Sequence, residues 1–232
     1  MTESKDRILA SIRQSLASAV MPAAEPYSGG AAPASAPGAP VGADKLAQRF
    51  GEELEKLSGV LIVEKASAVP ALVARLLRER SAQALLAWDG SLLPVPGLLD
   101  SLRAEGFRVA SGEIPSQEPE RSAALTEVEK ITVGLTGADA ALAETGTLAL
   151  LAGPGRPRLA SLSVTTHIAL FTPAELHPAL DAWWAARPDL AGWVRSGSHL
   201  TLISGPSRTA DIEMTLTVGV HGPAEVIAVL VR

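Results

Sequence analysis

The segment that decides the fold runs from Val60 to Ala110 and reads VLIVEKASAVPALVARLLRERSAQALLAWDGSLLPVPGLLDSLRAEGFRVA. Three short apolar runs in it have the length of buried strands: Val60–Val63, Ala84–Trp88 and Phe107–Ala110. The helical patterns between them are Ala68–Arg80 and Leu98–Glu105. Strands that alternate with helices at this spacing predict a parallel, doubly wound α/β sheet. Such a sheet binds ligands at the carboxyl ends of its strands.

Upstream of this segment, the sequence predicts three parts. Residues 1–16 form an amphipathic helix with the apolar stripe Ile8, Leu9, Ile12 and Leu16. Residues 17–43 form a linker, because 22 of the 27 residues are Ala, Gly, Pro or Ser. The folded domain, residues 44–232, begins with a helix that ends at Gly59. The first helix either docks on the body or a sister subunit, or serves as an arm for another partner.

Downstream of Glu129 the pattern changes to strands with few helices. The strand-like runs are Ile131–Thr136, Thr147–Ala152, Ile168–Phe171, Leu200–Ser204, Thr215–Val220 and Val226–Val231. One clear helix is expected between them, at Pro173–Ala186. The second half therefore predicts a mixed sheet in which some strand pairs are adjacent in sequence.

Composition excludes several classes of protein. The 232-residue chain has no cysteine, which excludes disulfides and thiolate-bound zinc or iron–sulfur clusters in this chain. Its formal net charge is −5 and its sequence has no Lys/Arg cluster of five or more, so a nucleic-acid surface is not expected. The apolar runs are too short to span a membrane, and the charged N-terminus lacks a signal-peptide core. The expected location is the cytoplasm.

The first polar segment that bears chemistry is Thr136–Thr147, TGADAALAETGT. Gly146 suits a tight turn with positive φ, which presents Glu144 between two strands. Two interpretations are open: a hairpin whose acid is solvated, or a site in which Glu144 is a base or nucleophile. A phosphate loop is less favoured, because neither GxGxxG nor GxxxxGK[ST] is present.

The second such segment, Gly205–Pro223 (GPSRTADIEMTLTVGVHGP), is the predicted functional centre. Gly205 begins a sharp exit from a strand, and a helical turn starting at Ser207 would point backbone N–H groups at an anion. Arg208 can hold a carboxylate or phosphate with two parallel hydrogen bonds. The predicted anion-binding residues are Gly205, Ser207, Arg208, Thr209, Asp211, Glu213 and Gly222. The alternative is a capped turn with a local ion pair between Arg208 and one of the acids.

Two histidines complete the set of candidates. His221 lies between a strand and the Gly222–Pro223 turn, where its ring is expected to be exposed and able to transfer a proton. His167 precedes an apolar strand and is interpreted mainly as a structural residue. No metal site is predicted, because no HxH, HxxxH or HExxH pairing occurs.

Together, Thr136–Thr147, Gly205–Glu213 and Gly219–Pro223 resemble the LUD-domain family, named for lactate utilisation, and in particular its C-type subunit. The similarity covers most of the chain from about Ile131 to the C-terminus. It implies a Rossmann-like α/β fold, with a mixed sheet flanked by helices, similar to the sugar-isomerase and CoA-transferase superfamily. Ser163–His167 (SVTTH) departs from the family pattern, since it lacks the proline expected before the histidine.

The resemblance also implies a function. The chain would be one of three subunits that oxidise L-lactate to pyruvate, and the sister subunits would carry the iron–sulfur clusters. In that assignment Arg208 holds a small carboxylate or an anionic cofactor, and His221 or Glu144 exchanges the proton. Two alternatives stay open: a non-catalytic assembly or regulatory subunit, and a CoA-transferase or isomerase relative that uses Glu144. Association of several copies of the chain is also left open.

Overall fold

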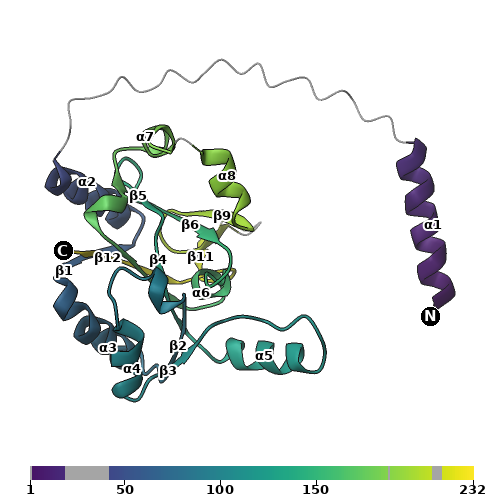
Figure 1. Ribbon diagram of the computed structural model, residues 1–232, viewed down its shortest axis with the longest axis horizontal. Coiled ribbons are helices and arrows are strands. Elements are labelled where there is room, and N and C mark those ends of the chain that lie inside the picture. The colour runs from purple at the N-terminus through teal and green to yellow at the C-terminus, as the bar shows by residue number, and fades with distance from the viewer. Residues whose placement is uncertain (1, 19–41, 188, 211–215) are drawn as a thin grey trace. The chain divides into compact units, whose positions relative to one another are not determined.

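The computed structural model describes residues 2–18, 42–187, 189–210 and 216–232 (Figure 1). The chain divides into two compact units, Met1–Pro37 and Gly38–Arg232. The first contains helix α1 (Thr2–Ser18), on which Ile8, Leu9 and Ile12 form an exposed stripe. Residues 19–41 of the predicted linker lie outside the described residues. In the described ranges, no helix is both long enough and apolar enough to cross a bilayer.

The second unit begins with the predicted alternation of strands and helices, which is confirmed. Its elements are α2 (Ala43–Lys56), β1 (Val60–Glu64), the 3₁₀ turn η1 (Ala66–Ala68), α3 (Val69–Glu79), β2 (Ala84–Ala87), the 3₁₀ turn η2 (Gly90–Leu92), α4 (Leu98–Ala104), β3 (Arg108–Ala110) and α5 (Glu120–Glu129). Pro70 occupies the first turn of α3, where its missing N–H is tolerated.

The remaining elements are mainly strands. They are β4 (Val133–Gly137), β5 (Ala140–Leu142), β6 (Thr147–Ala152), α6 (Leu159–Leu162), β7 (Thr166–Phe171), η3 (Pro173–Glu175), β8 (Leu176–His177), α7 (Leu180–Ala185), α8 (Leu190–Arg195), β9 (His199–Ile203), β10 (Arg208–Ala210), β11 (Leu216–Val218) and β12 (Glu225–Val231). Strands β5 and β6 form an antiparallel hairpin. This pair fulfils the expectation of strand pairs adjacent in sequence.

The predicted helix at Pro173–Ala186 is wrong. The chain instead forms η3, the short strand β8 and then α7. Pro178 explains the difference, because proline disfavours the helical conformation of the residue before it and has no N–H to donate. The carbonyl of His177 accepts a hydrogen bond from Ala143 N, so tertiary pairing uses the backbone at the break.

The main sheet has six strands in the order β1-β12-β7-β4-β2-β3, and all neighbours are parallel. Strands from the second half of the unit lie in the middle, while β1 and the β2–β3 pair lie at the two edges. The two halves of the sequence therefore share one α/β sheet, in agreement with the predicted fold class.

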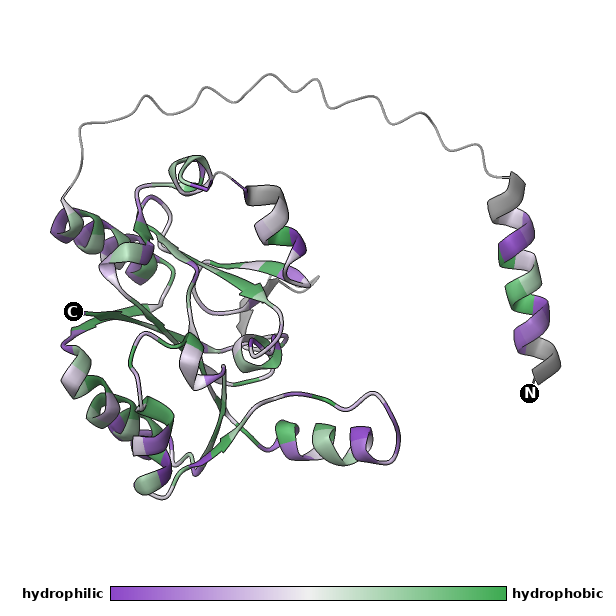
Figure 2. Ribbon diagram, viewed as in Figure 1, coloured by the Kyte–Doolittle hydropathy of each residue, from purple (hydrophilic) through white to green (hydrophobic). Residues whose placement is uncertain are grey.

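Helices cover both faces of this sheet. Strand register puts Leu61 and Gly134 on the same face, where α2 lies over Leu61 and α6 lies over Gly134. Figure 1 shows α3 and α4 on the opposite face. Every residue of β12 from Val226 to Val231 is buried. Figure 2 shows this strand as hydrophobic, between helices that carry both hydrophilic and hydrophobic residues. The main core therefore lies on both sides of the central strands.

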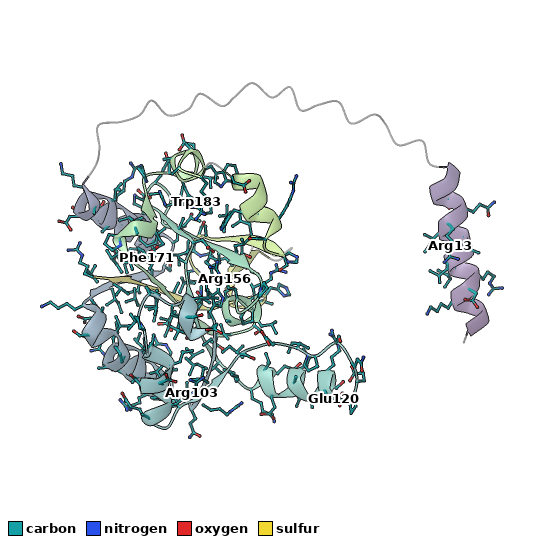
Figure 3. The ribbon with its side chains drawn as sticks, in the orientation of Figure 1. Arg13, Arg103, Glu120, Arg156, Phe171 and Trp183 are labelled. Carbon is teal, nitrogen blue, oxygen red and sulfur yellow. The ribbon has the colours of Figure 1, made fainter. Side chains whose placement is uncertain are left out.

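A second sheet, ordered β8-β5-β6-β9, packs on the α2 side and has its own small core. Trp183 of α7, labelled in Figure 3, is 1% exposed in this cluster beside Ala140, Leu142 and Ala149. Its ring meets Trp193 edge-on, with 5.4 Å between the ring centroids. The second sheet supports the polar hairpin turn that lies between β5 and β6.

Candidate functional site

The turn between β5 and β6 lies against the C-terminal end of α2. Gly146 has φ of 59°, as the sequence predicts. A Cβ at Gly146 would lie 2.4 Å from Leu54 N, so only glycine fits this approach. Glu144 is exposed on the turn, and its N–H donates to the carbonyl of Pro178. A hairpin is therefore present, although its first strand is β5 rather than the predicted Ile131–Thr136, and Glu144 is presented to solvent beside α2. The role of Glu144 stays a prediction.

The Gly205 loop reaches the same end of α2. Thr147 Oγ1 and Ser204 Oγ share a 2.8 Å hydrogen bond, which ties this loop to the Glu144 hairpin. A Cβ at Gly205, whose φ is 79°, would lie 2.7 Å from the carbonyl oxygen of Leu57. The two glycine-bearing segments, far apart in sequence, are therefore joined around one helix end.

Arg208 is fixed at this helix end by its own side chain. Its Nη2 donates to the carbonyl oxygen of Leu57 at 2.7 Å and to Ser58 Oγ at 2.9 Å. A cation at the C-terminus of a helix is stabilised by the helix dipole and by the free carbonyl groups. Both bonds use Nη2, so Nε and Nη1 are not engaged by them.

Ser207 does not begin a helical turn, in contrast to the sequence expectation. The chain enters strand β10, which pairs antiparallel with β11. Ser207 N donates to the carbonyl of Pro223, and Ser207 O accepts from Gly219 N. The backbone N–H at Ser207 is therefore used within the fold, which leaves side chains rather than a helix N-terminus to bind an anion.

The residues Gly222 and His221 lie next to Ser207. A Cβ at Gly222 would lie 3.1 Å from Ser207 Cβ, and His221 is exposed, as expected. Thr209 lies in β10. The candidates Asp211 and Glu213 lie outside the described residues. We call the group of Glu144, Gly205, Ser207, Arg208, His221 and Gly222 the α2-end cluster.

The α2-end cluster lies where parallel strands begin, not where they end. Helix α2 leads directly into β1, and Ala224 N, just before β12, donates to the carbonyl of Thr165, just before β7. A cavity of about 780 Å³ lies at the other end of the strands, at their carboxyl ends after β2 and β3. Its lining includes Asp89, Asp100 and Glu113, and Arg103 pairs with Asp100 at 2.7 Å. This acidic lining is unsuited to an anionic ligand.

His167 belongs to neither location. It is fully buried in β7, and its Nε2 shares a 2.8 Å hydrogen bond with Thr136 Oγ1. Its Nδ1 has no hydrogen-bond partner among the described residues. Burial lowers the pKa of His167 to about 4, so the ring is neutral at pH 7. This agrees with the interpretation of His167 as a structural residue.

The buried His167 predicts a loss of stability in acid. Its pKa in the folded state lies below the ordinary value of 6.5, so the unfolded state takes up the proton first as the pH falls. The contribution is complete above about pH 6.5, and about 2 kcal/mol of it is lost by pH 5. Urea unfolding at pH 7.5 and pH 5 should therefore show a smaller decline for His167→Gln than for the wild type. An equal decline in both proteins would contradict the assignment.

Sequence reasoning missed a charged network at the start of β12. Arg80, at the end of α3, donates from Nε and Nη2 to both carboxylate oxygens of Glu225, at 2.7 and 2.5 Å. Thr166 Oγ1 donates to the same carboxylate at 2.9 Å. Arg80 lowers the pKa of Glu225 through its hydrogen bonds. An acid directly before a buried strand was the one sequence signal for this pair.

Within the described ranges, no group of three or more His, Asp or Glu side chains is arranged to hold a metal ion.

The chain is similar in sequence to a protein family and to several of its members, and similar in fold to a solved structure. Residues 47–231 match a family described as LUD domain. A lactate utilization protein C from Halalkalibacterium halodurans is 32% identical over 190 residues, which cover 82% of this chain and 80% of the relative. Another from Exiguobacterium sp. is 43% identical over 121 residues, 50% of each chain. The crystal structure of a DUF162 family protein from Deinococcus radiodurans has a TM-score of 0.61 at 21% identity, covering 83% of this chain and 100% of that one.

Proposed function

Because the chain belongs to the LUD-domain family, we propose that it acts in lactate utilisation as the carboxylate-binding subunit of an L-lactate-oxidising assembly. The observation that carries the proposal is the 80% coverage of a relative named lactate utilization protein C. The position of the Glu144 and Gly205 segments around the end of α2 supports it, because these two segments contain the candidate anion-binding and proton-transfer side chains.

The carboxylate of lactate would bind to Arg208. The bonds from Nη2 to Leu57 and Ser58 hold the guanidinium in place, so little side-chain entropy is lost when an N–H of Nη1 or Nε binds the carboxylate. Both two-bond forks of a guanidinium include Nη2, so the contact proposed here is a single charge-assisted hydrogen bond. Ser207 and Gly222 are the neighbours that would complete the contact. Charge also favours an anion at the end of the sheet where the strands begin. The cavity at the carboxyl ends of the strands is lined by the acids Asp89, Asp100 and Glu113.

Oxidation of lactate to pyruvate removes the proton of the hydroxyl group and a hydride from the carbon that carries this group. Exposed His221 or Glu144 would accept the proton. The hydride must leave as two electrons and a proton to an acceptor. Because the chain has no cysteine, we assign the iron–sulfur clusters that carry the electrons to sister subunits.

Lactate-dependent dye reduction by the reconstituted subunits tests this proposal. Arg208→Gln should lower kcat/KM for L-lactate by about 10- to 100-fold, because charge-assisted hydrogen bonds are worth about 1.5–3 kcal/mol. Arg75→Gln serves as the control, since Arg75 is an exposed arginine on α3, and should retain wild-type activity. Full activity of Arg208→Gln would remove the carboxylate site and favour an assembly role, in which Arg208 only caps α2.

A further inference from the structure

A second, separate feature lies on the side of the main sheet where the strands begin, near β2, β3 and β4 rather than near β1. A cavity of about 580 Å³ opens beside the starts of β2, β3 and β4. Its polar lining consists of Arg80, Ser81, Gln83, Arg108, Lys130 and Thr132. Every ionisable side chain in the lining is a cation, although the whole chain has a net charge of −5. We call this cavity the basic cavity.

Arg80 forms a rigid wall of the basic cavity. Besides its two bonds to Glu225, it donates from Nη1 to the carbonyl of Leu76 at 2.8 Å. Its side chain is only 20% exposed, so its position is set before any ligand arrives. A guanidinium held in this way loses little conformational entropy when it binds an anion.

Arg108 and Lys130 already converge on a carboxylate. Lys130 Nζ lies 2.7 Å from Glu127 Oε1, and Arg108 Nη2 lies 3.7 Å from Glu127 Oε2. Lys130 and Arg108 lower the pKa of Glu127, with the hydrogen bond from Lys130 the larger cause. Glu127 belongs to α5, which Figure 1 shows extending away from the sheet, and it is not part of the cavity lining. The two cations are thus placed to bind an anion, and Glu127 competes for them.

Neutral donors complete the lining. The side chains of Ser81, Gln83 and Thr132 line the cavity without a hydrogen bond to another described residue. Arg108 and Lys130, the remaining N–H groups of Arg80 and the neutral donors between them exceed what a monocarboxylate such as lactate can use. A phosphate group carries about −1.5 to −2 charges and three acceptor oxygens, which match several donors at once.

We infer that the basic cavity is a binding site for a phosphorylated small molecule, separate from the α2-end cluster. Its volume lies within the range of about 300–1,000 Å³ that is usual for small-molecule sites. Arg80 and Arg108 contact the phosphate oxygens, and Lys130 turns from Glu127 to the ligand. Binding weakens as salt concentration rises, because Arg108 and Lys130 are exposed.

Calorimetric titration of the full-length protein with inorganic pyrophosphate at low ionic strength tests the inference. The double variant Arg108→Gln/Lys130→Gln should raise Kd by about tenfold or more, since it removes two charges from the lining. Glu127→Gln should lower Kd, because it removes the competing carboxylate. Arg103→Gln, an exposed arginine at the opposite edge, should leave Kd unchanged.

Each of these variants changes an exposed side chain, so a matching circular dichroism spectrum can be required of all of them. No binding to the wild type, equal Kd in the wild type and the double variant, or weaker binding by Glu127→Gln would overturn the inference. The Arg108→Gln/Lys130→Gln variant should keep the wild-type kcat/KM for L-lactate in the dye-reduction assay, because both residues lie outside the α2-end cluster. Failure of the lactate proposal and failure of this inference are therefore distinguishable.

Discussion

The Gly134→Ala variant is expected to lose about 4 kcal/mol of unfolding free energy, a size reached only by specific defects such as core overpacking. A Cβ at Gly134 would lie 1.7 Å from the carbonyl oxygen of Ala160 and 2.7 Å from its carbon. These are backbone atoms of α6, which cannot move aside as a flexible side chain can. Strand β4 lies between β7 and β2, so displacement on either side disturbs the centre of the sheet.

Urea unfolding followed by circular dichroism measures the effect. A loss of this size corresponds to a fall in Tm of about 10 °C for a domain of this length. Gly153→Ala is the matched control, because its Cβ would meet only ordinary contacts at 3.6 and 3.7 Å. Stability of Gly134→Ala close to that of the wild type would mean that α6 does not pack directly on β4.

The Trp183→Ala variant is expected to lose about 3–5 kcal/mol, the range for removing a large buried aromatic side chain. Trp183 is 1% exposed and fills the small core under the second sheet. Arg187 lies over its ring at 5.2 Å and over the ring of Trp193 at 4.2 Å, so the truncation also removes a cation–π contact.

The neighbouring residue provides the control for this change. Trp184 is 40% exposed, so Trp184→Ala should cost less than about 1 kcal/mol. Because the core around Trp183 is separate from the main core, hydrogen exchange in Trp183→Ala should accelerate in β5, β6 and β9 before it does in β12. Equal stability of the two tryptophan variants would contradict a distinct second core.

Local patterns predicted much of this fold. The run Val60–Val63 and the helical pattern at Ala68–Arg80 have the length and periodicity of the observed elements, because burial selects those patterns directly. Strand β5 was missed because Ala140–Leu142 is short and rich in alanine, and only its pairing with β6 makes it a strand. The order of the strands was also beyond local patterns, since it depends on pairing between distant segments.

The candidate site was predicted unevenly for the same reason. The positive φ of Gly146 follows from local turn chemistry, and the sequence predicted it. The hydrogen bond from Arg208 to Leu57 joins residues 151 positions apart, so no local pattern contains it. It changes the expected role of Arg208, because the guanidinium caps α2 in addition to the anion binding that we propose. The position of the cluster where the strands begin likewise depends on the parallel pairing of distant strands, which no local pattern contains.

The most direct test of the central proposal is a crystal structure of the protein with pyruvate bound. The α2-end cluster predicts that the pyruvate carboxylate lies within hydrogen-bond distance of the Arg208 guanidinium, close to Ser207 and Gly222. Pyruvate found instead in the cavity lined by Asp89 and Glu113, or no pyruvate at Arg208 at saturating concentration, would contradict the proposal.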